Sequence, residues 1–263
     1  MKTYVIGDIH GGHKAMLQCF ERSGFDYEND HLISLGDIAD GWPEVTECFE
    51  ELFKIKNLTF IIGNHDWWLL NWLRTGSVPY LWTSQGGYAT IRSFNQLIDE
   101  DSNDPDAITY TNDFRIKMIH FLQDAPYYIV DDKNRLFVHG GYDLALPIDG
   151  QQPRFSRGKD SIYFWDRDMW YHAGYMHRTN LNRLKTSAST KIDKIGTFDE
   201  IFIGHTTTSR IYPNLKPVNF VNVWNLDQGG GWEGKLTIMD VDTHEYWQSD
   251  IVAGLYPKIR GRN

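Results

Sequence analysis

The sequence predicts an α/β fold in which two packed sheets are flanked by helices. Five short runs of aliphatic residues each end at or next to a glycine, which is typical of buried strands that stop at a turn. In the first half, strand-like runs alternate with helix-like patterns, whereas the later strands follow one another closely and resemble hairpins. No shift in composition marks a second domain, so we expect the 263 residues to form one domain.

The first half contains three strands that alternate with three helices. We expect strands at 2–7, 31–35 and 58–62, and helices at 13–23, 43–56 and 64–74. The first helix places Ala15, Cys19 and Phe20 on one apolar face. The second begins near Pro43, a residue that is favoured in the first turn of a helix.

The second half is richer in strands. The stretch 99–114 is predicted to be an acidic loop that leads into a helix. Six strands follow, near 126–131, 134–139, 201–204, 218–224, 234–241 and 243–250. Because the late strands are consecutive, we expect the second sheet to be mixed or antiparallel.

Polar motifs follow the five glycine-bounded strands in a fixed order. They occupy residues 7–11, 36–41, 63–66, 139–141 and 204–205. Since open α/β sheets bind ligands at the carboxyl ends of their strands, these motifs should bring six polar side chains to one edge. The six candidate ligands are Asp8, His10, Asp37, Asn64, His139 and His205.

This set of side chains suits two divalent metal ions. It combines nitrogen and oxygen donors without a thiolate, which favours Mn²⁺, with Fe, Zn²⁺ or Mg²⁺ as alternatives. Asp37 carries the kind of side chain best able to bridge two cations. Two ions about 3.5–4 Å apart can hold a bridging water, lower its pKa and clamp a phosphate for in-line attack.

Composition limits the partners. The net charge of −9 argues against non-specific nucleic-acid binding, which needs a basic surface. We expect no membrane association, because no apolar run approaches the length of a membrane span and the first strand leaves no room for a signal peptide. Only Cys19 and Cys48 are present, both in helix-like patterns, so a disulfide framework is not expected and a cytoplasmic location fits best.

The five motifs resemble those of the calcineurin-like metallophosphoesterases. Within that superfamily they are most similar to the bacterial branch related to Ser/Thr protein phosphatases (the PPP type), whose signatures run GDxHG, GDxxDRG, GNHE/D, HGG and GH. Further similar segments lie at 82–94, 121–139, 165–167 and 226–237. The resemblance implies a four-layer α/β/β/α sandwich of two mixed sheets with a dinuclear site at one edge. We expect one such domain over 1–263, with a helical insertion at roughly 67–125.

The resemblance also implies roles for individual residues. Asp8 and His10 would hold the first metal, and Asp37 would bridge. Asn64, His139 and His205 would hold the second metal. His65 and Asp40 would form a catalytic dyad in which the imidazolium protonates the leaving group and the carboxylate orients it.

One position departs from the family pattern. Where GDxxDRG has an arginine that grips the substrate phosphate, this chain has Gly41, followed by Trp42. We expect another arginine to replace it, because a planar guanidinium can hold two phosphate oxygens. Arg167 is the first candidate, followed by Arg154 and Arg157 in the loop 147–158.

These residues predict a phosphoesterase that cleaves phosphomonoesters by attack of a metal-bridging water. Its substrates would be phosphorylated small molecules or phosphoproteins, and a Ser/Thr protein phosphatase is one form of this hypothesis. An alternative is hydrolysis of nucleotides, dinucleoside polyphosphates or phosphodiesters. A third hypothesis is a non-catalytic metal-binding module for phosphoproteins, which the complete set of ligand and dyad residues disfavours.

Overall fold

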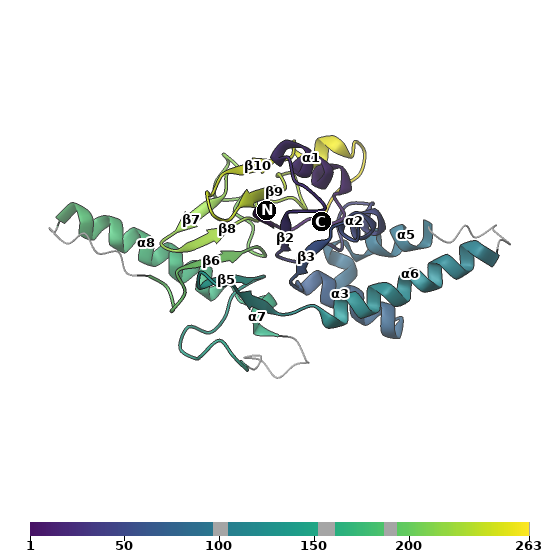
Figure 1. Ribbon diagram of the computed structural model, residues 1–263, viewed down its shortest axis with the longest axis horizontal. Coiled ribbons are helices and arrows are strands. Elements are labelled where there is room, and N and C mark those ends of the chain that lie inside the picture. Colours follow the sequence, from purple (N-terminus) through teal and green to yellow (C-terminus); the bar gives the residue numbers. More distant parts are fainter. Residues whose placement is uncertain (97–104, 152–160, 187–193, 263) are drawn as a thin grey trace.

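Two five-stranded sheets pack face to face in the computed structural model, which describes residues 1–96, 105–151, 161–186 and 194–262 (Figure 1). Both sheets are mixed, and helices cover their outer faces. The predicted fold class is therefore confirmed. None of the described helices is both long and apolar enough to cross a membrane.

The first sheet has the strand order β10-β9-β1-β2-β3. Its strands are β1 (Thr3–Ile6), β2 (His31–Ser34), β3 (Asn57–Phe60), β9 (Thr237–Asp240) and β10 (Tyr246–Gln248). β1, β2 and β3 are parallel, and the β9–β10 hairpin adds antiparallel to β1. Three strands therefore end at the same edge of this sheet.

The second sheet has the order β4-β5-β6-β8-β7. It is built from β4 (Tyr128–Val130), β5 (Arg135–Val138), β6 (Glu200–Ile203), β7 (Val218–Phe220) and β8 (Val223–Asn225). β5, β6 and β8 are parallel, while β4 and β7 are antiparallel edge strands.

Alternation along the strands explains the layers. In β1, Val5 packs between the two sheets, whereas Tyr4 and Ile6 face the outer helices. In β6, Phe202 likewise packs between the sheets and stacks on Phe137 of β5, with ring centroids 4.9 Å apart. Because successive side chains of a strand point to opposite faces, fully apolar runs of this kind require cover on both sides.

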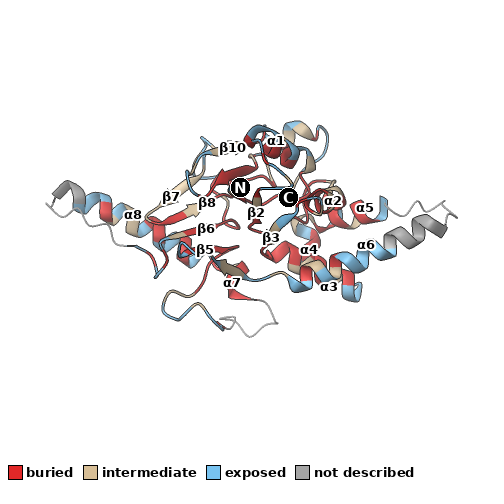
Figure 2. Cartoon of the chain, viewed as in Figure 1, coloured by how far each residue is buried: buried red, intermediate tan, exposed pale blue. Residues whose placement is uncertain are grey.

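The helices complete the sandwich and extend it at both ends. α1 (His13–Ser23), α2 (Val45–Leu52) and α9 (Val252–Leu255) contribute to the core outside the first sheet, and α7 (Ile162–Trp165) and α8 (Asp168–Thr186) to the core outside the second. Further helices lie between β3 and β4: α3 (Asn64–Thr75), α4 (Tyr80–Trp82), a π-helical turn (Thr83–Gly87), α5 (Tyr88–Gln96) and α6 (Pro105–Asp124). In Figure 2 the central strands and the inner helix faces are buried and the edge strands are partly buried, while α6 and α8 extend in opposite directions and become exposed.

Some predicted elements need correction. The single strand predicted at 218–224 is two strands, because Val221 adopts a left-handed conformation (φ 58°) and turns the chain between β7 and β8. The last predicted hairpin joins the first sheet through β1, so it is not part of the second. The helix α8 was not predicted, and α2 is shorter than 43–56. The helices α3 to α6 overlap the predicted insertion, whose boundaries stay a prediction.

Candidate metal centre and its neighbours

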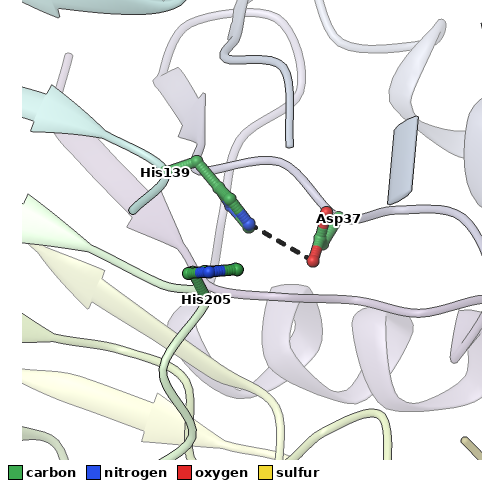
Figure 3. Close-up of side chains that lie close together, drawn as sticks. All are labelled: Asp37, His139 and His205. Atoms are coloured by element: carbon green, nitrogen blue, oxygen red, sulfur yellow. Dashed lines mark ion pairs between the residues drawn. The ribbon is translucent and has the colours of Figure 1, made fainter. Parts of the chain in front are cut away.

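All six predicted ligand residues lie together at one edge of the sandwich. Each follows a strand end, and none is more than 6% exposed. The potential ligand atoms form two groups that share Asp37, and within each group these atoms lie within 4.8 Å of one another. One group combines Asp37 with Asp8 and His10, and the other combines it with His139 and His205 (Figure 3).

Backbone carbonyls orient two of the imidazoles. His10 Nδ1 lies 2.9 Å from the Ala39 carbonyl oxygen, and His139 Nδ1 lies 2.7 Å from that of Leu35. Because a carbonyl only accepts, each Nδ1 donates, and in a neutral ring the Nε2 lone pair then faces the cluster. In metal sites, a histidine ligand typically donates its other ring N–H to a carbonyl or carboxylate in this way, which fixes the orientation of the ring.

Other ligand atoms of the cluster face one another, and one has no hydrogen-bond partner among the described residues. His139 Nε2 lies 3.2 Å from Asp37 Oδ2 and 3.3 Å from Asn64 Oδ1. Among the described residues, His205 Nε2 is buried without a hydrogen-bond partner. Buried polar atoms are nearly always paired, so this arrangement fits the binding of cations.

Burial and mutual charge shift the acid–base behaviour of the cluster. Burial raises the pKa of Asp8 well above its usual value, and the charge of Asp227 raises it further. Burial opposes ionisation of Asp37 as well, but the charges of His139 and His65 hold its pKa well below the usual range. Burial lowers the pKa of His139, yet the charge of Asp37 and its hydrogen bond raise it to about 9. Asp37 is thus the electrostatic centre of the group.

Four site residues adopt backbone conformations that are unfavourable for side chains with a Cβ. Their φ angles are 51° for His10, 52° for Asp37, 71° for Asp40 and 62° for His205. Positive φ is uncommon outside glycine, and such strain persists only where the surroundings impose it. Its concentration at the strand ends of this edge is typical of a functional site.

Asp66 fixes the loop that carries Asp37, a role that was not predicted. Its buried carboxylate accepts N–H groups from Asp37 (2.7 Å), Ile38 (2.9 Å), Ala39 (3.2 Å) and Gly63 (3.0 Å). The motif at residues 63–66 contained this aspartate, and its position in the first turn of α3 was the available signal. Gly63 is the N-cap of α3, so Asn64 is the first residue of the helix.

The two sheets are joined directly at the site. The His205 N–H lies 3.2 and 3.0 Å from the two Asp8 carboxylate oxygens, which connects the end of β6 to the end of β1. A Cβ at Gly204 would lie 2.0 Å from Asp8 Oδ1, so only glycine permits this approach. The glycine of the Gly-His motif therefore serves the contact between the sheets.

His65 and Asp40 form the predicted pair. His65 Nδ1 lies 2.5 Å from Asp40 Oδ2, and both residues are fully buried. Burial lowers the pKa of His65 well below its usual value, and the charge of Arg262 lowers it further. His65 Nε2 is buried and lacks a partner among the described residues, so it is available to a bound substrate.

Trp82 and Thr90 complete the environment of Asp40. Trp82 Nε1 donates to both carboxylate oxygens (2.9 and 2.8 Å), and Thr90 Oγ1 donates to Oδ1 (2.6 Å). Burial raises the pKa of Asp40 well above its usual value, and these hydrogen bonds oppose that shift. Since every partner of the carboxylate can donate, the ionised form is the one they satisfy. The segment 82–94 resembled the family, but sequence reasoning assigned these two residues no role.

Comparison with known proteins identifies the family. Residues 1–209 match the calcineurin-like phosphoesterases. This chain belongs to the calcineurin-like phosphoesterases. It is 25% identical to the symmetrical bis(5'-nucleosyl)-tetraphosphatase of Neisseria meningitidis, over 97% of this chain and 98% of that protein. It is also 25% identical to serine/threonine-protein phosphatase 1 of Salmonella typhimurium, over 90% of each.

The fold agrees with this assignment. A cold-active protein-tyrosine phosphatase from Shewanella superposes with a TM-score of 0.53 at 16% identity, over 95% of this chain and 80% of that one. The family depends on a dinuclear metal centre, and the relatives are hydrolases of phosphorylated compounds. This calcineurin-like phosphoesterase is therefore a metal-dependent phosphoric ester hydrolase.

The arginines predicted to replace the missing family arginine fall in different places. Arg167 Nη1 donates to the His205 carbonyl (3.1 Å) and to Thr206 Oγ1 (3.1 Å), so it adjoins the cluster from the second sheet. Its charge contributes to the lowered pKa of His205, after burial and the charge of His139. Arg154 and Arg157 lie outside the described residues.

Proposed function

We propose that this calcineurin-like phosphoesterase hydrolyses phosphomonoesters, including phosphoserine and phosphothreonine in proteins, at the edge where the two sheets meet. The observation that carries the proposal is the shared position of Asp37 in two groups of potential ligand atoms, next to the buried His65–Asp40 pair. A charged ester needs positioning and charge neutralisation above all, and this edge concentrates both.

Two divalent cations fit the cluster. Asp8 and His10 would hold one, Asn64, His139 and His205 would hold the other, and Asp37 would serve both. When bound, such ions supply Lewis acidity that activates water and neutralises phosphate charge. We propose Mn²⁺ as the native metal, because the donors are carboxylate, amide and imidazole without a thiolate.

His65 would act as the general acid. Its Nδ1 is held by Asp40, which fixes the ring and leaves Nε2 as the atom that meets the leaving-group oxygen. Trp82 and Thr90 hold the carboxylate in place and thereby act on His65 through Asp40. Imidazolium formation during turnover would be stabilised by the adjacent carboxylate charge.

Arg167 would contribute a guanidinium on the His205 side of the cluster. Its contacts with the His205 carbonyl and Thr206 use one terminal nitrogen, Nη1. A planar guanidinium has five donors, so its Nη2 and Nε groups would supply further hydrogen bonds to an anion bound beside the cluster.

A second candidate function is hydrolysis of dinucleoside polyphosphates. The Neisseria relative has this activity by name and aligns with 97% of the chain, so it favours this candidate as directly as the Salmonella relative favours the first. Either reaction would take place in the cytoplasm, the compartment that two buried free cysteines also favour.

A substrate panel tests the proposal. The protein would be loaded separately with Mn²⁺, Zn²⁺ and Mg²⁺ and assayed with p-nitrophenyl phosphate, a phosphoserine peptide, diadenosine tetraphosphate and bis-p-nitrophenyl phosphate. We expect metal-dependent release of phosphate from the monoesters, fastest with Mn²⁺. Preferential cleavage of diadenosine tetraphosphate would instead establish the second candidate, and no hydrolysis with any metal would refute both.

A further inference from the structure

Arg262, the last residue that the structure describes, reaches the candidate metal centre from the end of the chain. Its Nη1 lies 3.0 Å from His10 Nε2, the imidazole atom that faces the cluster. Its Nη2 donates to Gln85 Oε1 at 3.0 Å, and its Nε is buried without a partner among the described residues. A guanidinium is thus held beside the cluster with a donor that none of the described residues uses.

The backbone around Arg262 is anchored. Its N–H donates to the Gly231 carbonyl at 2.8 Å. The preceding Gly261 lies against the same carbonyl, since a Cβ there would be 2.5 Å from the oxygen and 2.8 Å from the Trp42 ring. The guanidinium itself lies 5.0 Å from the centroid of the Trp232 ring, a cation–π distance. Arg262 therefore has a defined place and is not a loose surface side chain.

The Arg262 side chain packs against two glycines, Gly41 and Gly231, which have no side chains of their own at these contacts. A Cβ at Gly41 would lie 3.1 Å from Arg262 Cγ, and a Cβ at Gly231 would lie 3.0 Å from Arg262 Cδ. Gly41 directly follows Asp40, the partner of His65. The Arg262 side chain therefore packs against the backbone of residue 41, where the family signature has an arginine.

We infer that Arg262 is a substrate-binding residue that holds a phosphate oxygen on the His10 side of the cluster. The inference rests on the proposed function, because it assumes that a phosphoryl group binds at the metal ligands. A cation held by His10 would take the lone pair that accepts the Arg262 Nη1 proton here. The guanidinium would then have Nη1 and Nε as free donors beside the bound anion, while Gln85 and Trp232 retain it.

Binding of inorganic phosphate to the Mn²⁺-loaded protein, measured by calorimetry, tests this role without turnover. Arg262→Ala should weaken phosphate binding by roughly 10- to 100-fold, the range for a lost hydrogen bond to a charged group. Arg262→Lys keeps the charge without the planar fork and should recover only part of the affinity. The matched control is Arg210→Ala, because Arg210 also lies over Trp232, at 5.1 Å, and is not in contact with His10 in the described structure.

Unchanged phosphate affinity in Arg262→Ala would overturn the inference, as would an equal loss in Arg210→Ala, which would indicate a general charge effect. Tighter Mn²⁺ binding with unchanged phosphate binding would show that Arg262 only blocks His10, and this result would also overturn it. Retention of the wild-type melting temperature in Arg262→Lys separates these results from misfolding. The substrate panel bears on the proposed function separately: its failure would leave the phosphate-binding comparison intact.

Discussion

At the scale of the single residue, His65 has one ring nitrogen bound to Asp40 and the other available. We expect His65→Ala to reduce hydrolysis of an alkyl phosphate by roughly 10²–10⁴-fold, the usual contribution of acid–base catalysis. The loss on p-nitrophenyl phosphate should be much smaller, because p-nitrophenolate leaves without protonation. Steady-state kinetics on the two substrates measure the difference. Equal losses on both would assign His65 a positioning role and refute the acid role.

Asp37 is the residue whose charge the two ligand groups share. Asp37→Asn keeps the shape and keeps an oxygen for the His65 N–H, which Asp37 Oδ1 accepts at 2.9 Å. It removes the charge, so we expect loss of bound metal and loss of turnover. Elemental analysis after dialysis and a phosphatase assay measure the two effects. The control is Asp132→Asn at an exposed carboxylate. Near-normal metal content in Asp37→Asn would show that Asp37 does not bridge.

At the scale of the element, α3 depends on Asp66 for its connection to the Asp37 loop. One carboxylate accepts backbone N–H groups from both segments, and burial together with the charge of Asp37 raises its pKa to about 7. Asp66→Asn removes two acceptor sites and introduces an amide donor among N–H groups. We expect a destabilisation of about 1–3 kcal/mol, measured by urea unfolding, together with weaker metal binding. An unchanged unfolding midpoint would show that the loop is held by other contacts.

The strand β2 carries a pH-sensitive group away from the cluster. His31 lies half-buried, with Nε2 2.9 Å from Thr59 Oγ1 on the neighbouring β3, and burial lowers the pKa of His31 below its usual 6.5. Protonation is therefore easier in the unfolded chain than in the fold. The contribution of neutral His31 to the stability of the fold is complete above pH 6.5. It is lost as the pH falls through the pKa that His31 has in the folded protein. In His31→Gln, the free energy of unfolding measured with urea should change less with pH in this range than in the wild type. An identical pH dependence in the variant and the wild type would refute the role of His31.

Elements were predictable where local pattern determines them. The strands β1, β2 and β3 follow from aliphatic runs bounded by glycine, and α1 from its apolar face. The division of residues 218–224 into two strands was not predictable, because Val221 has no intrinsic preference for positive φ and tertiary contacts impose it. The pairing of β9 with β1 joins segments more than 200 residues apart, and strand pattern alone carries no information about such a partner.

At the scale of the whole molecule, one part of the site follows from local sequence pattern and another part depends on long-range packing. The proximity of the six candidate ligands was predictable because strand ends of parallel sheets converge on one edge, and the structure places these side chains together. The positions of Trp82, Thr90 and Arg262 at the site were not predictable, because these residues come from segments whose placement depends on packing over long sequence distances. Arg262 is 252 positions from His10 along the chain. No spacing rule relates residues that meet only once both sheets are assembled.

The position of the cluster between the sheets has a consequence for stability. Asp8, Asp37 and Asn64 follow strands of the first sheet, whereas His139 and His205 follow strands of the second. Cations held by both sets would bind only the assembled sandwich, so binding would stabilise it relative to the unfolded chain. For one site at a free metal concentration of about 100 times Kd, this stabilisation is about 2.7 kcal/mol. In a protein of this size each kcal/mol shifts Tm by roughly 2–4 °C.

We therefore expect chelation to lower the melting temperature of the metal-loaded protein by roughly 5–10 °C, measured by differential scanning calorimetry with and without EDTA. Restoring Mn²⁺ should reverse the shift. Asp37→Asn provides the control, because a variant without the shared carboxylate should melt at the same temperature in both conditions. Melting of the wild type at one temperature regardless of EDTA would mean that metal does not join the two sheets. A shift equally large in Asp37→Asn would place the stabilising metal elsewhere in the molecule.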